Sequence, residues 1–68
     1  EGDERGSNKD AVRFLYIAKG SLAELRTQLI IANEIGYIDA LTLNDIDQKC
    51  QTLGKMIGSL IKARTSNL

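Results

Sequence analysis

The chain has no histidine, proline or tryptophan and a single cysteine, Cys50. Without histidine it lacks both the Glu-x-x-His ligands of a di-iron bundle and a Ser-His or Cys-His nucleophile. One cysteine excludes a disulfide within the chain, and there is no glycine-rich phosphate loop. We therefore expect no catalytic residue, no metal site, no cofactor and no small-molecule substrate, and we predict that the protein is not an enzyme.

Net charge and long apolar runs are lacking as well. Nine Lys and Arg balance nine Asp and Glu among 68 residues. No apolar run reaches the ~20 residues of a membrane helix, and no signal peptide is visible. A lone cysteine fits a reducing compartment, so we predict a cytoplasmic protein without membrane contact. Since so short a chain buries little surface, we expect other copies, or a preceding helical segment, to complete its core.

Residues 13–32 have the spacing of a helix that packs on other helices. Apolar side chains recur at intervals of 4, 3, 4, 3, 4 and 3, which places them along one seam. A second, partly apolar column runs beside the seam from Phe14 to Ile35, and this width is typical of a bundle. The seam consists of Ala11, Leu15, Ala18, Leu22, Leu25, Leu29 and Ala32.

A second seam lies nearer the C-terminus. Its spacing of 3, 4, 3, 4 and 3 again predicts a helix. Cys50 lies on this seam, and we interpret it as a small buried hydrophobe rather than a reactive thiol. The residues of the seam are Leu43, Ile46, Cys50, Leu53, Ile57 and Leu60.

The predicted boundaries make residues 1–68 a single helical module, with helices over about 8–35 and 42–64. Ser7 or Asn8 is expected to cap the first helix and Gly36 to end it. Thr42, three residues before Asp45, is expected to cap the second. Residues 1–7 and 65–68 are expected to be flexible.

The short connection predicts an antiparallel hairpin. Pairing Ile35 with Leu43 gives a register in which the two position numbers sum to about 78. Gly20 then lies level with Gly58, and two mid-helix glycines at one level suggest a close approach of the backbones.

One polar group interrupts the apolar face of the first helix. Ser21, Glu24 and Gln28 follow at intervals of three and four. We interpret them as a half-buried hydrogen-bonded set that fixes the register, and a ligand or partner contact is the alternative.

Charge is segregated along the second half of the chain. Residues 34–47 carry four acids and no base, whereas residues 48–68 carry four bases and no acid. This order suits the dipole of a helix, and it also allows copies of the chain to gather bases against phosphates. The nucleic-acid candidates are Arg5, Lys9, Arg13, Lys55, Lys62 and Arg64.

The motifs of the first helix resemble a known family, the four helix bundle proteins also called 23S ribosomal RNA intervening-sequence proteins. That family carries a pattern close to EG, R-x-S, RFL-x-IA-x-GS-x-x-EL-x-TQL-x-IA and LGY. The match is close over about residues 1–38 and is one of pattern alone in the second helix. The matching positions are Glu1, Gly2, Arg5, Ser7, 13–15, Ile17, Ala18, Gly20, Ser21, Glu24, Leu25, 27–29, Ile31, Ala32, Gly36 and Tyr37.

The resemblance implies an all-α fold in which this antiparallel two-helix hairpin is the C-terminal half of an up-down four-helix bundle. The family is similar to the accessory variability protein of diversity-generating retroelements, and such bundles assemble as pentamers. It therefore implies a homo-oligomer, a pentamer for the full bundle or a dimer for this chain alone. Our leading hypothesis is a non-enzymatic, self-associating bundle protein linked to ribosomal or other RNA. A protein-binding adaptor without a nucleic-acid role is the alternative.

Overall fold

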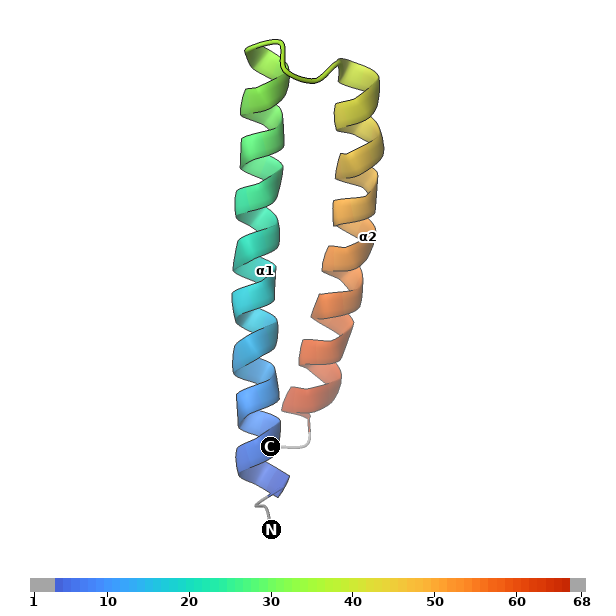
Figure 1. The fold of residues 1–68 in the computed structure, drawn as a ribbon. Helices are drawn as coiled ribbons and strands as arrows, with labels where there is room; N and C mark the ends of the chain where they lie inside the picture. Colours follow the sequence, from blue (N-terminus) through green and yellow to red (C-terminus); the bar gives the residue numbers. More distant parts are fainter. Residues whose placement is uncertain (1–3, 67–68) are drawn as a thin grey trace.

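Two long helices make up nearly all of the described chain. The computed structural model describes residues 4–66, with side chains described for residues 6–66. Helix α1 (Glu4–Glu34) and helix α2 (Ala40–Thr65) lie side by side in opposite directions (Figure 1). The molecule measures 51 × 15 × 15 Å, and residues 4–66 contain no strand. The prediction of an all-α antiparallel hairpin is confirmed.

Gly36 ends α1, as predicted. Its φ of 85° lies in the left-handed region that glycine enters without steric cost. The N–H of Tyr37 donates to the carbonyl of Ala32 at 2.8 Å, and the N–H of Gly36 donates to the carbonyl of Asn33 at 3.1 Å. These are the two bonds of a Schellman motif. The Nδ2 of Asn33 also donates to the carbonyl of Ile38 at 3.1 Å, which fixes the path of the connection.

Helix α2 begins at Ala40, two residues earlier than predicted, and Asp39 is its N-cap. The backbone of Asp39 is extended (φ −88°, ψ 171°), and its Oδ1 accepts a hydrogen bond from the N–H of Thr42 at 2.7 Å. The prediction that Thr42 caps the helix is wrong, because Thr42 lies in the first turn and donates to the cap. Hydrogen bonding from the side chain and then from the N–H of Thr42 lowers the pKa of Asp39, since the carboxylate form is the better acceptor.

Helix α1 begins at Glu4, earlier than predicted, so residues 4–7 are helical rather than flexible. The expected cap Asn8 lies inside the helix. Its Nδ2 donates to the carbonyl of Arg64 at 2.5 Å, and the Nη1 of Arg64 donates to the Oδ1 of Asn8 at 3.4 Å. Asn8 therefore links the two helices instead of capping one of them.

The C-terminal end of α2 is also longer than expected. The helix includes Thr65 and is followed by Ser66 as its C-cap. The flexibility predicted for residues 1–3 and 67–68 lies outside the described residues.

The contact between the helices buries some residues of the predicted seams and leaves others exposed. Leu15, Leu22, Leu29, Ile46 and Ile57 are partly or fully buried. The described side chains that are less than a tenth exposed are Cys50, Ile57 and Ile61. The burial predicted for Cys50 is confirmed, and its thiol is free. Leu25, Leu53 and Leu60 instead remain 43, 47 and 49% exposed, so they lie outside the contact that this hairpin makes.

Gly54 explains why the contact is rotated from Leu53 and Leu60 toward Gly54 and Ile61. A Cβ added at Gly54 would lie 3.4 Å from Cδ2 of Leu22, so the leucine packs where a larger side chain would stand. The absence of a side chain at Gly54 lets α2 turn this edge toward α1.

The predicted approach of Gly20 to Gly58 is wrong. A Cβ added at either glycine would meet nothing within 4 Å. The register differs from the expected one, because three contacting pairs have position numbers that sum to 76, 73 and 72 rather than 78. These pairs are Leu22 with Gly54, Arg26 with Asp47, and Asn8 with Arg64.

Candidate functional site

An ion pair links the helices in the half of the hairpin that contains the turn. Nε of Arg26 lies 2.6 Å from Oδ1 of Asp47, and Nη2 lies 3.3 Å from Oδ2. The Nε2 of Gln51 donates to the same carboxylate at 2.9 Å. The hydrogen bonds from Arg26 and then Gln51 lower the pKa of Asp47, and the pKa of Arg26 is raised in turn. With both ends of its fork bound to Asp47, Arg26 acts as a structural residue.

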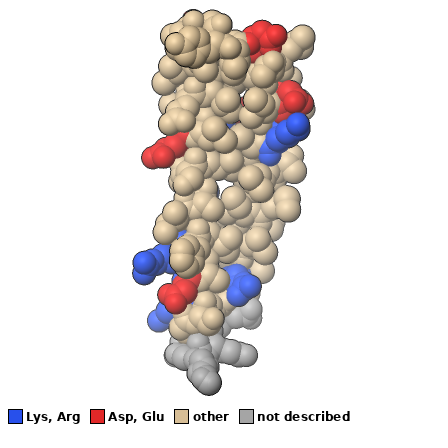
Figure 2. All heavy atoms as spheres, in the orientation of Figure 1, with Lys and Arg blue, Asp and Glu red and all other residues tan. Residues whose placement is uncertain are grey.

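The hairpin leaves a broad apolar face uncovered. Helix geometry places its members from α1 on the flank opposite to Arg26, and its members from α2 on the flank opposite to Gln51. Figure 2 shows this face, where a continuous uncharged area spans both helices and charged groups lie mainly at its edges and toward its ends. We call it the apolar face; it consists of Phe14 (69% exposed), Ile17 (55%), Leu25 (43%), Ile31 (50%), Ile35 (60%), Leu53 (47%), Met56 (57%) and Leu60 (49%).

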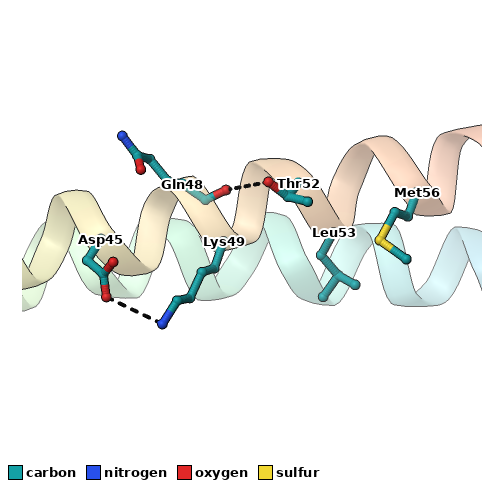
Figure 3. A pocket seen from close by; sticks show the side chains of 6 residues that line it. All are labelled: Asp45, Gln48, Lys49, Thr52, Leu53 and Met56. Atoms are coloured by element: carbon teal, nitrogen blue, oxygen red, sulfur yellow. Dashed lines mark hydrogen bonds and ion pairs between the residues drawn. The ribbon is translucent and has the colours of Figure 1, made fainter.

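A shallow hollow of about 430 Å³ lies on the α2 side of this face (Figure 3). All of its lining residues come from one helix, and two of them, Asp45 and Lys49, form an ion pair at 3.4 Å. A ligand site normally surrounds most of its ligand with several elements. The hollow is thus surface relief beside Leu53 and Met56 rather than a formed pocket.

The predicted polar set on α1 is not half-buried in the hairpin. Ser21, Glu24 and Gln28 are all exposed, and they separate Phe14 and Ile17 of the apolar face from Ile31 and Ile35. They form no register-fixing contact with α2, because α2 lies on the other flank of α1. Any helix that covers the apolar face would also approach these polar groups.

The two halves of the hairpin carry opposite charge. We call residues 4–20 and 54–66 the open half and residues 21–53 the turn half. The open half contains seven Lys and Arg against two Asp and Glu, whereas the turn half contains two against five. On the face in Figure 2, most blue groups lie toward the open end and most red groups toward the turn. Folding brings together bases from both ends of the sequence.

The predicted nucleic-acid residues divide into two groups. Lys55 and Lys62, seven residues apart on α2, share one side of that helix and are exposed. Lys9 and Arg13 are also exposed, but they lie on the outer side of α1, away from α2.

The two remaining candidates differ from these. Arg64 is exposed and bonded to Asn8. The side chain of Arg5 lies outside the described side chains.

A groove between the helices brings together two lysines, one of which the sequence analysis missed. Lys19 of α1 and Lys55 of α2 line the same hollow of about 440 Å³, together with Arg26 and Gln51. Lys19 lies 36 positions before Lys55, so their proximity depends on the register of the hairpin. We call this hollow the lysine groove; it lies on the side opposite to the apolar face.

The sequence matches the profile of one protein family, described as the 23S rRNA-intervening sequence protein family, over residues 1–59. The chain belongs to this family. No curated protein and no solved structure matched the chain. The match extends through α1 and most of α2, so both the lysine groove and the apolar face belong to the matched region.

Neither a metal-ligand cluster nor a membrane-spanning helix is found among the described residues of this member of the 23S rRNA-intervening sequence protein family. Within residues 4–66, no group of three or more Cys, Asp or Glu side chains is placed to hold a metal ion. Neither of the two described helices is both long enough and apolar enough to span a membrane.

Proposed function

We propose that this protein is a non-enzymatic, self-associating helical module that binds ribosomal RNA through its open half. The observation that carries the proposal is the lysine groove, where Lys19 and Lys55 from different helices face one space. Two ammonium groups at one groove attract the phosphate of a nucleic-acid backbone. The family description supports ribosomal RNA as the source of that phosphate.

The charge around the groove favours the same ligand. Lys62 continues the line of bases along α2 beyond Lys55, and the open half carries few acids. Arg26 at the turn side of the groove is neutralised by Asp47, so the attraction is strongest toward the open end. An RNA strand would therefore run along the groove toward the helix ends.

Self-association rests on a different surface. Eight large apolar side chains, each at least 43% exposed, lie on one face of the molecule. A face of this extent marks an interaction site in a soluble protein. Because it lies opposite to the lysine groove, other helices can cover it while RNA is bound.

The RNA part of the proposal is tested by a titration of the folded protein with a structured ribosomal RNA fragment at two salt concentrations. The double variant Lys55→Gln/Lys62→Gln removes two bases of the open half. We expect affinity to fall and the dependence on salt to become shallower, by about 0.7–0.9 in log-log slope for each phosphate that is no longer neutralised.

A matched control is Lys49→Gln, which removes an exposed lysine of α2 in the turn half. This variant should bind RNA as the unmodified protein does. Absence of binding at low salt, or an equal loss for the control, would contradict phosphate recognition by the open half. An adaptor with no nucleic-acid role would then be the better account.

A further inference from the structure

We propose that Gln51 makes the lysine groove specific for RNA over DNA, by accepting a hydrogen bond from a ribose 2′-hydroxyl. The inference rests on the proposed function, in which Lys19 and Lys55 bind backbone phosphate, and it adds a residue that recognises the sugar. It follows from the residues that line the groove, from the orientation of the Gln51 amide and from the chemistry of the two nucleic-acid backbones.

Gln51 lies beside the lysines of the groove. It lines the same hollow of about 440 Å³ as Lys19 and Lys55. It also lies four residues before Lys55 on α2, so the Cβ atoms of these two neighbours are about 5–6 Å apart. A ligand group that contacts Lys55 therefore places its neighbouring atoms within reach of Gln51.

Asp47 fixes the orientation of the Gln51 amide. The Nε2 of Gln51 donates to Oδ2 of Asp47 at 2.9 Å. Arg26 bonds to both oxygens of this carboxylate, and the hydrogen bonds from Arg26 and then Gln51 lower the pKa of Asp47. Because an ionised carboxylate only accepts hydrogen bonds, the nitrogen of the amide must face it and the oxygen must not.

The amide oxygen is left for a ligand. Gln51 is exposed, and within the described part of the chain no group donates a hydrogen bond to its Oε1. An amide oxygen can accept two hydrogen bonds. The charged side chains that line the groove, Lys19, Arg26 and Lys55, are all donors. The groove therefore combines two ammonium groups with one strong side-chain acceptor.

An RNA backbone matches this combination. Its phosphates are attracted by the ammonium groups, and its 2′-hydroxyl can donate to the amide oxygen. One nucleotide of RNA carries both groups, so it presents them close together. A DNA backbone offers the same phosphates but has no hydroxyl at the 2′ position, so it cannot satisfy Oε1 of Gln51.

A change in the nucleic acid tests the inference without altering the protein. The folded protein is titrated with a structured ribosomal RNA fragment and with the same fragment carrying fluorine in place of each 2′-hydroxyl. Fluorine keeps the sugar pucker of RNA but cannot donate a hydrogen bond. Since one hydrogen bond is worth about 1 kcal/mol, the natural RNA should bind about fivefold more tightly.

A change in the protein assigns this preference to one side chain. Gln51→Met keeps a long, unbranched side chain that suits a helix but removes the acceptor. It should bind the natural RNA about fivefold more weakly and the fluorinated RNA as before, so the preference disappears. The matched control is Gln48→Met, at an exposed position of α2 that lines the hollow beside Leu53 instead. This control should keep the full preference, and circular dichroism checks the fold of both variants.

A third variant tests Asp47 as a positioning residue. In Asp47→Asn, the new amide can donate to Oε1 of Gln51 as well as accept from Nε2, so it no longer holds Gln51 in one orientation. The preference for natural RNA should fall, though by less than in Gln51→Met. An unchanged preference would contradict the orienting role of Asp47.

The outcomes separate this inference from the proposed function. Salt-dependent binding with equal affinity for the two RNAs would overturn recognition of the hydroxyl and leave phosphate binding by the open half standing. A preference that persists in Gln51→Met, or that is lost equally in Gln48→Met, would overturn the assignment to Gln51. If neither RNA bound at low salt, the proposed function would be contradicted and this inference with it.

Discussion

The two ends of the hairpin are held together by different kinds of interaction. At the turn end, polar bonds predominate: the Schellman bonds at Gly36, the Asp39 cap and the Arg26–Asp47 pair. Toward the open end, the buried side chains of Ile57 and Ile61 pack between the helices. Most of the directional bonds thus lie in the turn half, whereas the open half combines the buried Ile57 and Ile61 with the Asn8–Arg64 contact.

The two halves differ in charge more than in exposed apolar area. The apolar face takes four of its eight side chains from each half, so apolar exposure does not distinguish the halves. The open half concentrates positive charge. An acidic surface should therefore stabilise the open half more than the turn half.

Truncation of a buried isoleucine should have the largest effect. Ile57 is 8% exposed in the open half, so Ile57→Ala should destabilise the protein by about 3 kcal/mol. A domain of this size holds only ~3–5 kcal/mol, so most of the helical circular dichroism should be lost at 37 °C. Ile46→Ala, at a half-buried position of the turn half, is the matched variant and should cost about half as much. Equal losses at one protein concentration would remove the contrast between the halves.

Glycine substitution should test the turn end. Gly36→Ala forces a side chain into a backbone with φ of 85° and should cost about 1–2 kcal/mol. Gly20→Ala, in the middle of α1 with open space around the new Cβ, should instead stabilise the protein by up to about 1 kcal/mol. Thermal unfolding of both variants measures the difference. A stabilising effect of Gly36→Ala would show that the turn is not held as described.

Acid should weaken the turn half by a smaller amount. The pKa values of Asp39 and Asp47 are lowered in the folded state, by hydrogen bonds from the side chain and N–H of Thr42 and from Arg26 respectively. Their stabilising contribution is therefore complete above the unfolded pKa of about 4 and is lost as the pH falls through the lowered values. Melting temperatures measured from pH 7 to pH 2 should decline below about pH 4.

The variants for this measurement differ by one carboxylate. Asp47→Asn should flatten the acid decline, because its neutral amide has no charge to lose. Asp10→Asn, which changes an exposed carboxylate of α1 with no side-chain partner among the described residues, should leave the decline unchanged. A decline that persists in full in Asp47→Asn would mean that the Arg26–Asp47 pair contributes nothing to acid sensitivity.

The sequence predicted the hairpin well because its strongest signals are local. Seam spacing and Gly36 were enough to place two antiparallel helices and to bury Cys50. The caps were harder, since Asp39 and Thr42 both suit an N-cap and only one position can hold it. Asn8 suited a cap equally well, but a contact with Arg64, 56 positions away, takes its side chain.

The candidate sites depended on information that spacing does not contain. Leu22 packs against Gly54, and α2 is turned so that Leu53 is exposed and Ile61 buried. The same register places Lys19 beside Lys55, although Lys19 belongs to no charge run. Which bases share a groove is a property of the pair of helices, so neither helix alone could predict it.

The buried thiol of Cys50 can be used to measure how often the two helices separate. Cys50 is 5% exposed and its thiol is free, so we expect a thiol reagent to modify it mainly when the helices separate. The rate of modification under native conditions therefore counts opening events. A partner that binds the closed hairpin would lower this rate of modification. The ratio of the rates with and without the partner would measure how much the partner stabilises the closed state.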